Sequence, residues 1–218
     1  MFRLIGSIPV LGALLKIANT YAYGGDYRAS EEFAGLALWI KRFAVPLMLA
    51  LVLTLCTVWP IIPHAVKSHE LSFSHATDFV QKPGVFISSV LPSLLGFGIG
   101  VYALIFGLAE PFVRQFRKLI DEQIKAGEIS HGSVLMLNSD LAFPLIVMVV
   151  GIAVGALQQA NLENQSLILI TWVMFWYSLI VMIEMISVIF RLAENSLLDK
   201  GLNGDENTKA VSDVTQGD

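Results

Sequence analysis

The chain has 218 residues, of which 55% are hydrophobic and only 15% are charged, and its mean hydropathy is +0.68. Charged side chains make up nearer a quarter of a soluble domain, so this composition excludes an ordinary soluble protein and indicates a membrane protein. The single cysteine, Cys56, excludes a disulfide within the chain. The formal net charge of −4 says less than the distribution of charges along the sequence.

Residues 1–42 form an N-terminal segment that precedes the first long apolar run. Four apolar residues recur in it at helical spacing: Leu4, Ile8, Leu11 and Leu15. This spacing predicts an amphipathic helix, although Pro9 weakens it. Two interpretations remain open, a helix that lies on the inner leaflet and a cytoplasmic helix that packs against the protein.

Four apolar segments are each long enough to cross a bilayer as a helix, which requires about 20 residues. They cover approximately residues 43–62, 84–109, 141–157 and 166–190, and the third can extend upstream toward Ser133. Glu184 is the one charged residue inside them. The predicted fold class is therefore all-α, a polytopic membrane protein with four transmembrane helices and amphipathic helices in the N-terminal segment and a cytoplasmic loop.

Lysine and arginine are distributed unevenly between the loops. Five lie in residues 1–42, four in the loop between the second and third spans and three in the tail 191–218, whereas the other two loops contain only Lys67 and Lys82. The positive-inside rule therefore places both termini and the middle loop in the cytoplasm. In this orientation Trp59 and Trp172 are expected at the outer membrane interface and Trp39 at the inner one.

A stripe of small residues follows one face of the second span. It consists of Ser89, Ser93, Gly96, Gly100, Ala103 and Gly107, which are spaced alternately by four and three residues. Small side chains let helix backbones approach closely in a bilayer, so the stripe predicts packing against another helix. That helix belongs either to the same chain or to a second subunit around a symmetry axis. Continuing the stripe reaches Glu110, where a ring of carboxylates at an axis would favour cations.

Two further features lie in the third and fourth spans. Gly151 and Gly155 have the spacing of a helix-packing pair, which predicts contact with the second span or with a neighbouring subunit. Glu184 is a carboxylate within a span, and such a group is expected to face protein or water. Its functional interpretation is a gating, proton or cation site, and the alternative is a structural hydrogen bond to Ser, Tyr or the backbone.

The middle loop and the tail complete the predicted cytoplasmic side. Residues 111–126 place apolar side chains on one helical face and charged ones elsewhere. The basic members are Arg114, Arg117, Lys118 and Lys125. They are candidates for contact with anionic lipid or a partner, and the alternative is a solvated loop helix. The tail from Asp199 is polar, acidic and free of aromatic residues, which predicts disorder in the absence of a partner.

Motifs for catalysis or cofactor binding are not found in the sequence. The outer loop contains three histidines without the close spacing of a zinc site, so no metal or cofactor is predicted. The sequence contains neither a phosphate-binding loop nor the motif of a serine hydrolase or zinc protease. We therefore expect a protein that is not an enzyme and that binds no nucleic acid directly.

Residues 91–110, LPSLLGFGIGVYALIFGLAE, resemble a stretch of uncharacterised bacterial four-span inner-membrane proteins that reads approximately Leu-Pro-x-Leu-Leu-Gly-Phe-x-x-Gly-x-Tyr-Ala. The matching residues are Leu91, Pro92, Leu94, Leu95, Gly96, Phe97, Gly100, Tyr102 and Ala103. The chain length and the four-span plan are also similar to those of the membrane component of the Kiwa anti-phage defence system. These resemblances imply a bacterial inner-membrane location and a role in defence, and they assign no activity.

Two functional hypotheses follow from these features. The first is a homo-oligomeric membrane protein that senses the state of the bilayer or forms a pore, and that signals to a cytoplasmic effector. The alternative is a membrane anchor or adaptor for a cytoplasmic partner, without conductance.

Overall fold

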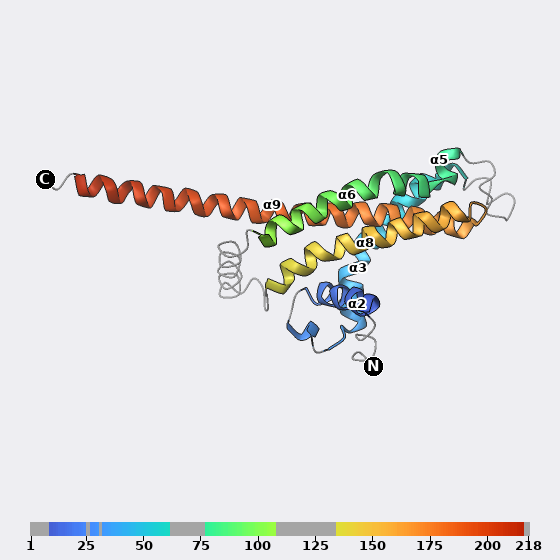
Figure 1. Ribbon diagram of the computed structural model, residues 1–218, viewed down its shortest axis with the longest axis horizontal. Helices are drawn as coiled ribbons and strands as arrows, with labels where there is room; N and C mark the ends of the chain where they lie inside the picture. The colour runs from blue at the N-terminus through green and yellow to red at the C-terminus, as the bar shows by residue number, and fades with distance from the viewer. Residues whose placement is uncertain (1–8, 25–26, 31, 62–76, 108–133, 216–218) are drawn as a thin grey trace.

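The computed structural model describes residues 9–24, 27–30, 32–61, 77–107 and 134–215, and every regular element in these residues is a helix. The elements in chain order are α2 (Pro9–Ala22), η1 (Tyr27–Ser30), α3 (Leu36–Val58), η2 (Trp59–Ile61), α5 (Asp78–Gln81), α6 (Pro83–Gly107), α8 (Val134–Ala160) and α9 (Gln165–Thr215). The predicted all-α fold is therefore confirmed (Figure 1).

Four of the helices are long and apolar enough to cross a membrane. Their apolar stretches are Leu36–Ile61, Pro83–Ile105, Leu137–Ala160 and Gln165–Arg191. Helices suit this environment because each one satisfies its backbone hydrogen bonds internally. The first begins at Leu36 rather than near residue 43, and α8 already begins at Val134. As a result Arg42 and Asp140, which precede the predicted residues 43–62 and 141–157, lie inside helices.

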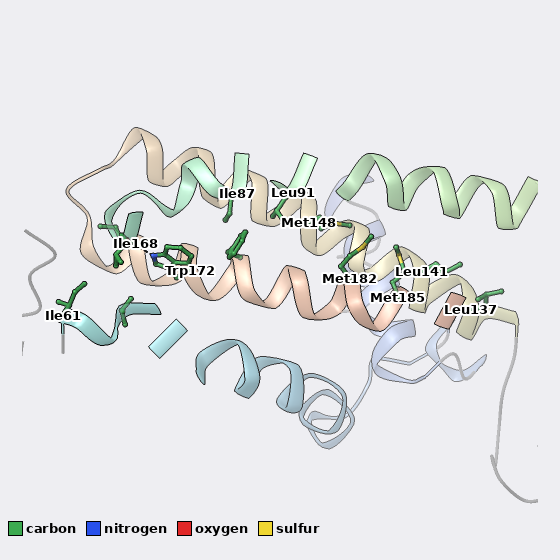
Figure 2. Close-up of a cluster of buried hydrophobic side chains, with 13 residues drawn as sticks. Ile61, Ile87, Leu91, Leu137, Leu141, Met148, Ile168, Trp172, Met182 and Met185 are labelled. Carbon is green, nitrogen blue, oxygen red and sulfur yellow. Dashed lines mark hydrogen bonds between the residues drawn. The ribbon is translucent and has the colours of Figure 1, made fainter. Parts of the chain in front are cut away.

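The α8 and α9 helices form the centre of the bundle (Figure 1). The turn at residues 161–164 joins them, α6 packs mainly on α8, and α3 packs mainly on α9. Figure 2 shows the main core between these helices, in which Leu91, Met148 and Trp172 are fully buried. Lipid tails are as apolar as these side chains, so the packing depends on close fit more than on exclusion of water.

Glycines allow α6 and α8 to approach closely. A Cβ added at Gly155 would lie 2.6 Å from Cγ2 and 2.9 Å from Cβ of Ile87. A Cβ added at Gly151 would lie 3.0 Å from Cδ1 of Leu91. Gly84 of α6 in turn faces the backbone of Gly155. The predicted pair Gly151 and Gly155 therefore lies against the second span of the same chain.

Trp172, expected at the outer membrane interface, is completely buried within the protein. Its indole Nε1 donates a hydrogen bond to the Val80 carbonyl oxygen at 2.9 Å, and the rings of Phe79 and Phe86 lie beside it. The short helix α5 supplies this acceptor, so the indole does not need the polar membrane surface to satisfy its N–H. Trp59 is 66% exposed, as an interfacial tryptophan would be.

The N-terminal helix α2 packs against α8 and α3 beside the start of α3, which we call the Arg42 end of the bundle. Its buried side chains lie in its last turn, at Asn19, Tyr21 and Ala22, whereas Leu11 is 53% exposed. The described residues thus agree with a helix packed on the protein. A helix lying on the lipid surface stays a prediction.

The tail from Asp199, predicted to be disordered, is helical as far as Thr215. The free-energy cost of forming a helix lies mainly in its first turn, and the first turns of α9 lie within the bundle, ahead of the tail. Each further residue then adds one hydrogen bond, and residues 192–215 contain no proline to interrupt the series. The continuation of α9 extends beyond the other helices (Figure 1).

Candidate functional site

The small-residue stripe of α6 faces away from the rest of the described chain. Its members are all exposed: Ser89, Ser93, Gly96, Gly100, Ala103 and Gly107. A Cβ added at any of its three glycines would meet no atom within 4 Å. At about 100° per residue the stripe lies opposite the face with Ile87, Leu91 and Gly98, which is buried. The prediction that the stripe packs against a helix of the same chain is therefore wrong for the described residues.

The exposed face of α3 has a different composition from the stripe. It consists of large apolar side chains, including Val45, Leu47, Met48, Leu49, Val52 and Leu55. Such a surface suits contact with lipid tails. The stripe instead presents almost only backbone, with the exposed side chains of Phe97, Ile99 and Leu104 on its two sides. The two exposed faces therefore differ in how closely another helix could approach them.

A polar cluster joins four helices at the Arg42 end. Arg42 of α3 donates from Nη2 to Oδ1 of Asp140 of α8 at 2.8 Å. Tyr21 of α2 donates its hydroxyl to Oε2 of Glu184 of α9 at 2.9 Å. The guanidinium carbon of Arg42 lies 4.4 Å from the centre of the Tyr21 ring, which brings the two pairs together. Asp140 is almost completely buried, and a buried carboxylate requires such a partner.

Aromatic rings fix the position of Tyr21 in this cluster. Its ring stacks on Phe143 with centroids 4.1 Å apart and meets Phe43 edge to face at 5.4 Å. Burial raises the pKa of the Tyr21 hydroxyl above its usual value near 10; Arg42 lowers it in part, and Glu184 adds to the rise. Tyr21 is therefore neutral at physiological pH and is available as a hydrogen-bond donor.

The charges of the cluster do not balance. With Asp140 and Glu184 ionised, one guanidinium faces two carboxylates and the sum is −1. Arg42 pairs directly with Asp140, and Glu184 accepts a hydrogen bond from the neutral hydroxyl of Tyr21. The hydrogen bond from Tyr21 is the structural role predicted as the alternative for Glu184, and a gating, proton or cation role stays a prediction.

Asn19 fixes the chain between α2 and α3. Its Nδ2 donates to the carbonyl oxygens of Ala29 and Glu32 at 3.0 and 2.8 Å, and its Oδ1 accepts from the Ala34 amide at 2.8 Å. Gly24 turns the chain just after α2 with φ of 63°, a conformation that glycine adopts without strain. These contacts hold the last turn of α2 beside the start of α3.

Several predicted site residues lie outside the described part of the chain. They are Glu110, Arg114, Arg117, Lys118 and Lys125. Conversely, Asp140, Tyr21 and Asn19 were not predicted as site residues. Asp140 could have been found, because it is the one acidic residue within the apolar run of α8. Tyr21 carries no such signal, since its partner Glu184 lies 163 positions away.

Comparison with protein-family models, with curated proteins and with solved structures finds no match to this chain. Within residues 9–61 and 77–215, so far as they are described, no three His, Cys, Asp or Glu side chains gather as metal ligands would. The fold and its four apolar helices define the class as a multi-pass α-helical membrane protein.

Proposed function

We propose that this chain is a homo-oligomeric bacterial inner-membrane protein that responds to the state of the bilayer, without enzymatic activity. In the oligomer the stripe of α6 packs against a second subunit. The Arg42 end faces the cytoplasm, because twelve of the fourteen lysines and arginines belong to residues 1–42, 108–133 and 191–218 of the sequence. The response is either the opening of a pore or a signal to a cytoplasmic effector.

The observation that carries this proposal is the exposure of the stripe. Four other glycines lie against a neighbouring helix: an added Cβ at Gly84, Gly98, Gly151 or Gly155 would come within 3.0 Å of an atom there. The three stripe glycines have open space instead. Glycine in a helix costs up to about 1 kcal/mol relative to alanine. Close packing of a second helix on this face would explain why glycine occupies three positions there.

Cross-linking between subunits tests the proposal. Gly100→Cys and Ser93→Cys lie on the stripe one heptad apart, whereas Ile99→Cys is exposed but lies about 100° from Gly100 around α6. All three are made in a Cys56→Ser background, since Cys56 is itself exposed. Under oxidation in native membranes, Gly100→Cys and Ser93→Cys should form covalent dimers more efficiently than Ile99→Cys. Equal efficiency, or no dimer from any of them, would contradict the proposed interface.

Conductance decides between the pore and the signalling forms. Purified protein in planar bilayers is recorded at rest and under membrane tension, with Glu110→Gln and Glu184→Gln as variants. A pore should conduct, and loss of either carboxylate should change its cation selectivity. A conducting protein whose selectivity neither substitution alters would exclude a role for these carboxylates. No current under tension from an oligomeric protein would leave the signalling form.

The alternative function, a membrane anchor or adaptor, is favoured by the continuation of α9. From Arg191 to Thr215 this helix extends about 36 Å at 1.5 Å per residue. Such a helix offers a surface for a cytoplasmic partner, with the basic loop Arg114, Arg117 and Lys118 as a second candidate surface. Affinity purification compares the full chain with a truncation after Leu198 and with the three basic residues changed to Glu. Identical partners for all versions would argue against this function.

A role in anti-phage defence is the most specific part of the proposal. It is supported by the likeness in length and span number to the Kiwa membrane component. Phage infection of cells with and without the gene and its neighbours tests it directly. Unchanged plaque numbers over a broad phage panel would contradict the defence role and leave the oligomer proposal standing.

A further inference from the structure

The most buried side chains of α2 lie toward its end, where Ile17 and Ala18 also pack, half-buried, against the core around Tyr21. The buried side chains of α2 are those of Asn19, Tyr21 and Ala22, whereas Leu11 and Lys16 earlier in the helix are exposed. Tyr21 supplies the hydrogen bond from α2 to α9.

Tyr21 touches each of the three other helices at the Arg42 end in a different way. Its hydroxyl donates to Glu184 of α9, one ring face stacks on Phe143 of α8, and the guanidinium of Arg42 of α3 lies over the ring. Asp140 holds that guanidinium at 2.8 Å. The position of α2 therefore depends on two coupled pairs, Tyr21 with Glu184 and Arg42 with Asp140.

The docked position also has an energetic cost. Nε of Arg42 is buried and has no hydrogen-bond partner in the described part of the chain, and Nε1 of Trp39, one turn earlier on α3, is in the same condition. Buried donors without partners are unfavourable, so the polar contacts at this end are incompletely satisfied. Parts of a protein that open locally have few fully buried side chains, and α2 has them only in its last turn.

We propose that α2 is a detachable element of this protein, latched onto the bundle by the hydrogen bond between Tyr21 and Glu184 and positioned by Arg42 and Asp140. Release of α2 exposes the Glu184 carboxylate and the ring of Phe143 at the Arg42 end. The α2 latch, as we call it, is independent of the proposed oligomer because it involves no residue of the stripe.

Cysteine accessibility measures the latch in the full-length protein. Ala22→Cys, buried in the last turn of α2, is the reporter in a Cys56→Ser background, and the protein is held in nanodiscs so that both faces are open to a polar maleimide. Tyr21→Phe removes only the hydroxyl, and Glu184→Leu removes the acceptor. Each should increase the labelling rate about tenfold or more, as expected for a hydrogen bond to a charged group.

The double variant and two controls distinguish a latch from general loosening. Tyr21→Phe combined with Glu184→Leu should label no faster than the faster single variant, because both remove the same bond. Tyr23→Phe, which removes a nearby hydroxyl, should leave the rate unchanged. Thr171→Cys, completely buried in α9 toward the other end, should stay unlabelled in every variant.

Three results would overturn the inference. Labelling of Ala22→Cys that neither Tyr21→Phe nor Glu184→Leu accelerates would show that this bond does not hold α2. A double variant whose labelling rate rises by the product of the two single increases would show that the two residues act separately. Labelling of Thr171→Cys together with Ala22→Cys would show that the whole bundle loosens.

Discussion

Two glycine-to-alanine substitutions should have opposite effects on the stability of the single chain. A Cβ at position 155 would lie 2.9 Å from Cβ of Ile87, a side chain with no exposed surface. This Cβ is bonded directly to the backbone, so no change of rotamer relieves the contact and α6 must move away from α8. A Cβ at position 100 meets no atom within 4 Å.

The magnitudes follow from two opposing contributions. Overpacking costs roughly 1–3 kcal/mol, and replacing glycine by alanine in a helix returns up to about 1 kcal/mol. Gly155→Ala should therefore lower the free energy of unfolding by about 1–2 kcal/mol. Gly100→Ala should leave it unchanged or raise it by up to about 1 kcal/mol, since only the helix preference changes.

The assay must separate stability of the chain from association. Unfolding free energies are measured by steric trapping in bicelles, at dilutions where the chain is a monomer, and self-association is measured at higher protein density. Gly100→Ala should weaken self-association alone if the stripe is a subunit interface. A Gly155→Ala protein as stable as the wild type, or a Gly100→Ala monomer equally destabilised, would refute the assignment of the two faces of α6.

Three further experiments test the buried polar contacts. Asp140→Asn should destabilise the bundle by roughly 1–3 kcal/mol, because it leaves the partly buried guanidinium of Arg42 without its counter-charge. The control Asp78→Asn, at an exposed ion pair, should cost less than about 0.5 kcal/mol. Equal losses of stability in chemical unfolding would contradict this contrast. Trp172→Phe should lower the free energy of unfolding by about 1–3 kcal/mol in the same assay, since it removes the indole donor of the Val80 carbonyl oxygen. An unchanged stability would mean that another group replaces the indole. Because the pKa of Tyr21 is raised in the folded protein, docking of α2 is stabilised below about pH 10 and weakens as the pH rises further. The labelling rate of Ala22→Cys should therefore increase above about pH 10. In the Tyr21→Phe background, where labelling is already rapid, the rate should not increase with pH.

The membrane-spanning plan of this protein could be predicted from the order of its residues. Long runs without charge, such as 166–190, have few alternatives to a spanning helix, because only internal hydrogen bonds satisfy the backbone in lipid. The helix ends were harder to place. Arg42 and Asp140 lie inside helices that begin before the predicted spans, and their mutual contact across α3 and α8 stabilises them there.

The tail shows the limit of composition as a guide. From Asp199 onward its residues are typical of a disordered segment, yet α9 continues to Thr215. The composition describes the tail as an isolated peptide. In the chain it is attached to a helix that has already formed, and the cost of nucleation does not recur.

The direction of each helix face was decided by tertiary structure alone. The sequence pattern identified the stripe and the pair Gly151 and Gly155 as packing surfaces, but both α6 faces are apolar or small and a bilayer exerts little hydrophobic force to choose between them. The choice came from shape, since Ile87 fits against Gly155 and leaves the stripe outside. The bond between Tyr21 and Glu184 was equally hidden, because residues 163 positions apart meet only when the helices between them have packed.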